Sequence, residues 1–157
     1  MNARAALSAV VVAGLLLSAP SSSYAQVQFG GQVNVGTETD FGIGGRIVAN
    51  MHEVSGGLGF IGSFDIYFPD GPKDYFELNG NLIYTIDLKE TTNAPYVGGG
   101  LNVGHASNGG SDTELGLNLL GGIKFPLPGV TLFFELRGTI LTDIAEQVVF
   151  TGGFLIP

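Results

Sequence analysis

The sequence predicts an all-β protein, an eight-stranded antiparallel up-and-down transmembrane β-barrel preceded by a cleaved signal peptide. Three observations lead to this prediction. Apolar and polar residues alternate with a period of two after residue 26, no amphipathic helix pattern persists there, and turn-forming residues recur between the alternating segments. A length of 157 residues fits one domain of this kind.

The composition excludes several other classes of protein. Charged residues make up 13% of the chain, against about 25% in ordinary soluble domains, and the chain has no Cys and only two His, at positions 52 and 105. A net charge of -8 disfavours a nucleic-acid partner, because phosphate binding requires clustered Lys and Arg. We therefore expect no nucleic-acid partner, no metal site and no cofactor.

The first element is the signal peptide, predicted over residues 1–25. Arg4 gives a short basic start, residues 5–19 form an apolar run, and the small residues Ser23 and Ala25 precede Gln26. The apolar run is shorter than the ~20 residues that cross a bilayer as a helix. We expect cleavage after Ala25, which leaves an exported barrel domain over residues 26–157.

The first four strands are predicted from alternation in segments 27–35, 41–47, 58–68 and 76–86. In the first segment Val33 and Val35 alternate with Gln32 and Asn34. Turn signals at residues 36–40, 50–56, 69–74 and 87–94 follow these segments.

The last four strands are predicted in segments 97–103, 115–125, 132–136 and 148–156. In the seventh segment Leu132, Phe134 and Leu136 alternate with Glu135 and Arg137. Turns are predicted at residues 105–112, 126–129 and 141–146. An even number of antiparallel strands without a covering helix must hide its edges, and closure into a barrel does so.

The face on which the charges lie separates two kinds of barrel. A soluble, lipocalin-like ligand-binding barrel in the periplasm would keep its apolar frame inside and coat its outside with charge. A membrane barrel reverses this arrangement. Because the polar frame is mostly Gly, Asn, Gln, Ser and Thr, the membrane barrel is favoured. The few charges in that frame would then form a lumenal network, predicted to comprise Arg46, Asp65, Glu77, Glu114, Lys124, Glu135 and Arg137.

Three stretches resemble a known family. APYVGGGLNV at residues 94–103, TELGLNLLGGIKF at residues 113–125 and FFELRG at residues 133–138 are similar to the outer membrane protein β-barrel domain family of small OmpA/OmpX-like, porin-like barrels. The resemblance covers residues 26–157. It implies a protein of the cell outer membrane that contacts outer-membrane lipid or lipopolysaccharide and the barrel assembly machinery. Such barrels usually end in an aromatic residue, whereas this sequence ends in Ile156 and Pro157.

Eight strands enclose a space that side chains fill, so a diffusion pore is not expected. The implied role is structural, in the envelope, or an interaction at the cell surface, with a monomer favoured. With periplasmic termini, an acidic outer rim is predicted from Asp40, Asp70, Asp74, Asp112, Asp143 and Glu146. Carboxylates there either solvate the loops or bridge to lipid phosphates through divalent cations.

An enzymatic alternative comes from residues 105–108, HASN, which resemble the H-x-S-N motif of the lipid A deacylase barrels. The resemblance implies that His105 would take the proton of Ser107 during acyl transfer, with Glu114 as the orienting carboxylate. The alternation of the two strands sends His105 and Glu114 to opposite faces. The simpler hypothesis is a tight hairpin loop, and we expect no enzymatic activity.

Overall fold

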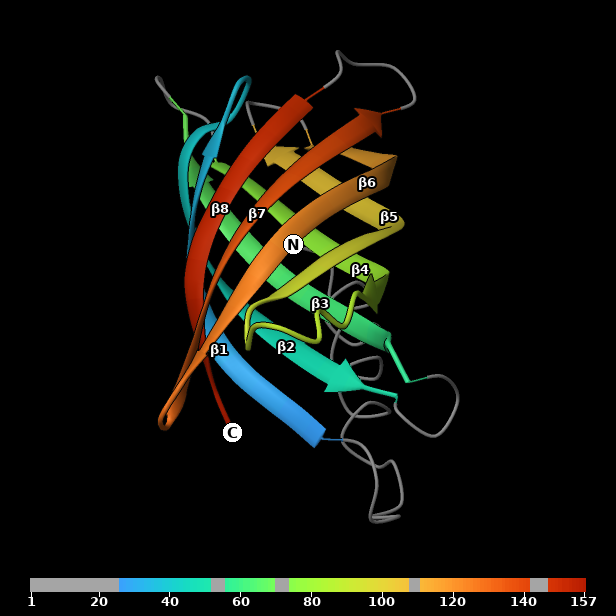
Figure 1. The fold of residues 1–157 in the computed structure, drawn as a ribbon. Helices are drawn as coiled ribbons and strands as arrows, with labels where there is room; N and C mark the ends of the chain where they lie inside the picture. Colours follow the sequence, from blue (N-terminus) through green and yellow to red (C-terminus); the bar gives the residue numbers. More distant parts are fainter. Residues whose placement is uncertain (1–25, 52–55, 70–73, 108–110, 142–146) are drawn as a thin grey trace.

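A computed structural model describes residues 26–51, 56–69, 74–107, 111–141 and 147–157. The predicted signal peptide lies outside the described residues and stays a prediction. The described chain forms eight strands (Figure 1), namely β1 (Gln26–Gly36), β2 (Asp40–Asn50), β3 (Leu58–Phe68), β4 (Asp74–Thr85), β5 (Ala94–Ser107), β6 (Ser111–Leu127), β7 (Val130–Leu141) and β8 (Gln147–Ile156). Within the described ranges, no helix is both long and apolar enough to cross a bilayer.

The strands form one closed barrel in which every strand pairs antiparallel with its neighbours in sequence. Closure comes from β1 and β8, whose register runs from Phe29 opposite Ile156 to Gly36 opposite Val149. Since eight antiparallel strands return the chain to its starting end, β1 begins and β8 ends at the same end of the barrel (Figure 1). The predicted all-β, up-and-down barrel is therefore confirmed.

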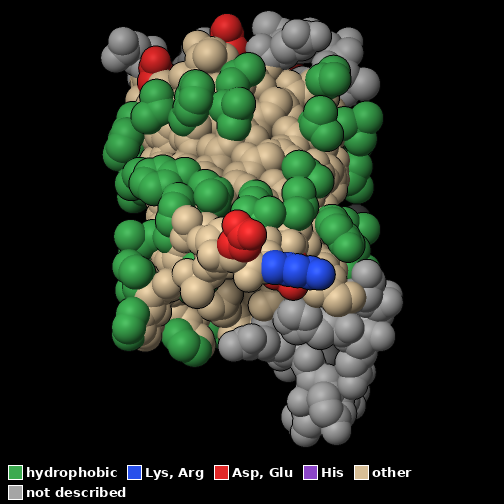
Figure 2. Space-filling model, in the orientation of Figure 1, with side chains coloured by type: hydrophobic (Ala, Val, Ile, Leu, Met, Phe, Trp, Pro, Cys, Tyr) green, Lys and Arg blue, Asp and Glu red, His purple; other side chains and the backbone are tan. Residues whose placement is uncertain are grey.

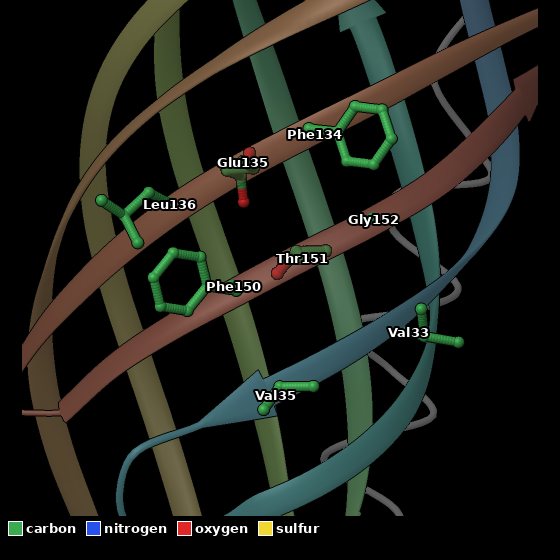
Figure 3. Close-up of a pocket in the computed structure, with 8 residues that line it drawn as sticks. All are labelled: Val33, Val35, Phe134, Glu135, Leu136, Phe150, Thr151 and Gly152. Atoms are coloured by element: carbon green, nitrogen blue, oxygen red, sulfur yellow. The ribbon is translucent and has the colours of Figure 1, made fainter.

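The barrel wall is apolar outside and mainly polar inside. Large apolar side chains point outward from every strand, and Leu101 and Leu119 are 63% and 76% exposed. Figure 3 shows the alternation on β7, where Phe134 and Leu136 lie on the outer side of the wall and Glu135 lies between them on the inner side. On the face shown in Figure 2, hydrophobic side chains cover much of the wall, while charged ones lie at the upper rim and in the lower part. All eight predicted alternation frames are confirmed.

Two hairpins are tighter than predicted. The turn expected at residues 105–112 is shorter, because β5 continues to Ser107 and β6 starts at Ser111. The turn expected at residues 126–129 reduces to Pro128 and Gly129, because β6 continues to Leu127 and β7 starts at Val130. Gly129 has a φ of 80°, the value that the third position of a type II turn requires after a proline.

A layer of apolar side chains fills the barrel interior at the end that holds the termini. It is buried and consists of Val48, Ile61, Ile83, Tyr96, Leu120, Phe133 and Leu155. These residues occupy inward positions near the starts of β3, β5 and β7, near the ends of β2, β4 and β8, and just past the middle of the long strand β6. This layer was not predicted from the sequence, and it divides the interior into an apolar end and a polar remainder.

Glycines have different roles on the two sides of the wall. A Cβ atom at the inward Gly122 would lie 2.5 Å from the hydroxyl oxygen of Tyr96, so glycine there makes room for that ring. On the outward side a Cβ atom at Gly45 would meet nothing within 4 Å. Each strand carries one outward glycine, and these are Gly31, Gly45, Gly62, Gly80, Gly99, Gly121, Gly138 and Gly152.

Candidate functional site

The candidate site is the charged interior of the barrel, and its first part joins β2 to β7. The Nη2 atom of Arg46 lies 2.7 Å from Oε1 of Glu135, and Nη1 donates a second hydrogen bond of 3.0 Å to Oε2. The hydroxyl of Tyr96 donates to the same Oε2 at 2.8 Å, and the guanidinium lies 4.2 Å from the centre of the Phe133 ring. This bidentate ion pair therefore packs directly against the apolar layer.

A second ion pair joins β7 to β4. The Nη2 atom of Arg137 lies 2.6 Å from Oε2 of Glu77, and it also donates to the hydroxyl oxygen of Tyr67 at 3.2 Å. The hydroxyl of Tyr75 donates to Oε1 of Glu77 at 3.0 Å. Glu77 has no solvent-exposed surface. The cation and the hydrogen-bond donors together offset the cost of burying this carboxylate.

Asp65 on β3 is held in a different way. Its Oδ1 atom accepts hydrogen bonds from the side-chain amides of Gln32 at 2.6 Å and Asn34 at 2.7 Å. Its Oδ2 atom accepts from the Ser63 hydroxyl at 2.9 Å and from the Asn79 amide at 3.2 Å. Neither of the two ion pairs formed by described residues includes Asp65. Four uncharged donors therefore replace the water that this carboxylate has lost.

An amide ladder continues this network around the inner wall. Oδ1 of Asn79 accepts from Asn102 at 2.8 Å and from Asn118 at 2.9 Å, while Thr139 donates to Asn118 at 2.8 Å. Four buried side-chain atoms in the described chain have no hydrogen-bond partner, namely Gln32 Oε1, Arg46 Nε, Asn102 Oδ1 and Arg137 Nε. Most polar atoms of the ladder are thus paired by neighbours within the wall, which makes the interior a fixed scaffold.

The other two residues of the predicted network are members of neither ion pair. Lys124 is nearly buried, and its Nζ atom lies 5.2 Å from the centre of the Tyr96 ring, among the residues of the apolar layer. Glu114 is partly exposed near the opposite end of the barrel, where it lies across from Gly104 in the register of β5 and β6. The structure thus brings together Arg46 with Glu135 and Arg137 with Glu77, but it joins neither Lys124 nor Glu114 to them.

The residues of the HASN motif do not converge on one point. His105 lies opposite Thr113 in the register, its Nδ1 is 2.9 Å from the Thr113 hydroxyl oxygen, and its ring packs 4.9 Å from that of the outward Phe76. Glu114 points to the inner side with Gly104, where an added Cβ atom would meet the Tyr75 hydroxyl. The imidazole and the carboxylate therefore lie on opposite faces of the wall. Asn108 lies outside the described residues.

The predicted acidic rim is described only in part. Asp40 is exposed at the start of β2 and has a φ of 56°, a left-handed conformation that Asp tolerates better than most residues. Asp70, Asp143 and Glu146, and the side chains of Asp74 and Asp112, lie outside the described part. In the described part, no three His, Cys, Asp or Glu side chains gather as a metal site.

Sequence reasoning missed the neutral members of the interior network. Gln32, Asn34, Asn79, Asn102 and Asn118 are all buried. Their signal was present in the alternation, because each occupies the polar frame of its strand. What alternation did not provide was the partner of each amide, which depends on the register between strands.

No protein-family model matches the chain, and no curated protein sequence matches it. Solved structures do share its fold. The N-terminal β-barrel domain of Pseudomonas aeruginosa OprF aligns with a TM-score of 0.69 at 16% identity, covering 84% of this chain and 98% of that domain. Neisserial surface protein A aligns with a TM-score of 0.60 at 18% identity, covering 85% and 99%. The predicted likeness to small outer-membrane barrels is thus confirmed for the fold.

The fold also extends to an enzyme. The outer membrane enzyme PagL aligns with a TM-score of 0.51 at 14% identity, covering 83% of this chain and 99% of that one. At such identities the likeness concerns the backbone and does not transfer a catalytic site.

Proposed function

We propose that the chain is a small outer-membrane β-barrel protein with a filled lumen and a structural, envelope or surface-interaction role. One observation carries this proposal, namely the inverted sidedness of the wall. Large apolar side chains are exposed on the outside of all eight strands, while Arg46, Asp65, Glu77, Glu135 and Arg137 are buried inside. This distribution suits a wall surrounded by lipid.

A water-soluble carrier is a poor fit to the same observation. Soluble monomers rarely expose continuous apolar patches beyond a few hundred Å², whereas here the apolar side chains encircle the barrel. A lipocalin-like barrel also needs an apolar cavity for its ligand. The interior of this barrel instead holds two ion pairs and a ladder of amides.

A diffusion pore is also a poor fit. Asp65, Glu77 and Asn102 are 0% exposed, so no water-sized space borders these side chains. Below them, the apolar layer fills the end of the barrel that holds the termini. Eight strands enclose an interior just wide enough for side chains, and this sequence fills it.

The proposed orientation combines the topology with the predicted export. With both termini in the periplasm, as export through a signal peptide would give, the apolar layer faces the periplasm and the exposed Asp40 and Glu38 face outward. Lipid or lipopolysaccharide would then surround the wall, and the barrel assembly machinery would insert the chain. In a monomer every strand is already paired along both of its edges, because the barrel is closed.

The proposal is tested by location and by conductance. We expect the full chain in the outer-membrane fraction, with a band that migrates differently on gels before and after boiling. We expect no channel openings when the folded protein is added to a planar lipid bilayer in concentrated KCl. Recovery as a soluble periplasmic protein would refute the membrane location, and regular conductance steps would refute the filled lumen.

One observation favours an enzymatic role as a second candidate function. His105 and Ser107 both occupy outward positions at the end of β5, where an enzyme acting on membrane lipid would place them. The inward position of Glu114 disfavours this role, because the orienting carboxylate would be missing. A direct assay for acyl-ester hydrolysis decides between the two roles.

A further inference from the structure

An apolar groove of about 580 Å³ crosses the outer wall obliquely from β1 to β5. Its floor is formed by three outward glycines, Gly45, Gly62 and Gly80. Its sides are formed by large apolar side chains, among them Phe60 and Phe64 from β3 and Leu101 from β5. Gly62 and Gly80 lie directly opposite each other in the register, so the floor is continuous between β3 and β4.

The packing of this chain does not require the groove. A Cβ atom at Gly45 would meet nothing within 4 Å, and one at Gly80 would meet only the Phe60 ring, at 3.7 Å. A second groove of about 470 Å³ lies over β7, β8 and β1 (Figure 3). The Phe134 ring lies 3.5 Å from the Cβ position of Gly152 there, and in the first groove the Phe60 ring lies 3.4 Å from that of Gly62, whereas Gly45 has no such neighbour. The floor at Gly45 is therefore open space that a side chain could fill without strain.

The lining defines the chemistry of an occupant. Arg46, Ser63 and Asn79 border the groove through their place in the strands, but their side chains are buried on the inner side in the network described above. The groove therefore presents only apolar side chains and paired strand backbone. A headgroup, a sugar or a peptide would lose its hydrogen bonds to water there without replacement, whereas a hydrocarbon would not.

The shape of the groove favours a long, flexible hydrocarbon. Four strand spacings separate β1 from β5, which gives a length of roughly 19 Å at about 4.8 Å for each spacing. The groove also follows a curved wall and is continuous with the apolar surface that faces lipid in the proposed function. We propose that this groove is a specific binding site for one acyl chain of a bilayer phospholipid. The inference rests on the proposed function, because it requires the wall to lie in a membrane.

The experiment compares two glycines that face outward and have open surroundings. Gly45→Leu fills the floor of the groove, whereas Gly138→Leu adds the same side chain on β7, where a Cβ atom would approach only the Leu119 carbonyl oxygen, at 3.9 Å. The full chain is purified in detergent, incubated with palmitoyl phosphatidylethanolamine and analysed by native mass spectrometry. We expect one retained lipid on the wild-type protein and on Gly138→Leu, and none on Gly45→Leu.

A second measurement uses only the wild-type protein, so its result does not depend on whether a variant folds. Wild-type barrel is reconstituted in phosphatidylethanolamine vesicles that carry a diazirine on the palmitoyl chain, and the cross-linked residues are mapped after illumination. Labels concentrated on Phe60, Phe64 and Leu101 would support the site, and labels spread evenly around the wall would overturn it. Equal lipid retention by all three proteins, or a dimer that Gly45→Leu abolishes, would also overturn it. Loss of the membrane location would instead refute the proposed function.

Discussion

Arg46 on β2 and Glu135 on β7 meet inside the barrel and share two hydrogen bonds, of 2.7 and 3.0 Å. β1 and β8 separate their strands, and the residues lie 89 positions apart in sequence. The contact therefore exists only when the barrel is closed. Together with the Arg137 and Glu77 pair, it ties opposite parts of the wall through the interior.

Removal of one partner from the second pair should destabilise the protein strongly. Arg137→Met leaves the buried Glu77 carboxylate without a cation, and we expect the free energy of unfolding to fall by about 3–5 kcal/mol. The measurement is the fraction of folded, heat-modifiable band along a urea series in phospholipid vesicles. The double variant Arg137→Met with Glu77→Met should recover much of the loss, because no unpaired charge remains. A loss below about 1 kcal/mol in the single variant, the range of exposed pairs, would contradict a dry interior.

The loss of stability caused by an arginine on the outer wall should depend on how deep the substituted position lies in the membrane. Leu136 lies in the middle of β7, and Ile140 lies one residue before its end. We expect Leu136→Arg to lower the free energy of unfolding by about 2–4 kcal/mol and Ile140→Arg by about 1 kcal/mol or less, because the cost falls toward the membrane surface. The same urea series measures both variants. Equal effects at the two positions would argue against a lipid-facing wall.

The apolar layer should contribute more to stability than the outer wall at neighbouring positions. Phe133 is buried in that layer, whereas Phe134 is 60% exposed on the outside. We expect Phe133→Ala to cost about 3–5 kcal/mol, because it opens a cavity and removes the ring beneath Arg46. Phe134→Ala should cost less, since lipid can occupy the space that the ring leaves. If the order of the two losses were reversed, the inward layer would not be part of the core.

The HASN segment should behave as a hairpin and not as a catalytic site. We expect purified protein to release no fatty acid from lipid A, and we expect Ser107→Ala to leave folding unchanged. Mass spectrometry of the lipid extract detects any released acyl chain. Release that disappears in both Ser107→Ala and His105→Ala would establish a hydrolase and show that Glu114 is dispensable or reoriented. An unchanged signal in the two variants would identify a contaminating enzyme.

The sequence was sufficient to predict the strands and their faces, because alternation is a local property. Leu132, Phe134 and Leu136 lie outside, and Glu135 and Arg137 lie inside, as their period of two requires. The partners across the interior could not be predicted, since they depend on how far each strand slides against the next before the barrel closes. Glu114 shows the difference, because its inward position was predictable but its separation from both ion pairs was not.

The apolar layer was missed for a related reason. Ile61 and Phe133 stand in the inward frame of their strands, but alternation along one strand does not show which apolar residues of different strands meet. Only the closed barrel shows that they meet at one level. The β5–β6 hairpin was expected to be tight, but its turn was placed too widely at residues 105–112, because Gly- and Ser-rich sequence around residue 108 favours a turn without indicating its length.

The ladder between β1 and β8 has a kinetic consequence. It extends from Phe29 opposite Ile156 to Gly36 opposite Val149, and it is shorter than the β5–β6 ladder, which extends from Ala94 opposite Lys124 to Ser107 opposite Ser111. The β5–β6 hairpin can form from nearby residues within microseconds, whereas the β1–β8 contact must bring together the two ends of the domain. Because such long-range pairing is intrinsically slow, we expect the joining of these two strands to be the slowest step in the folding of this barrel.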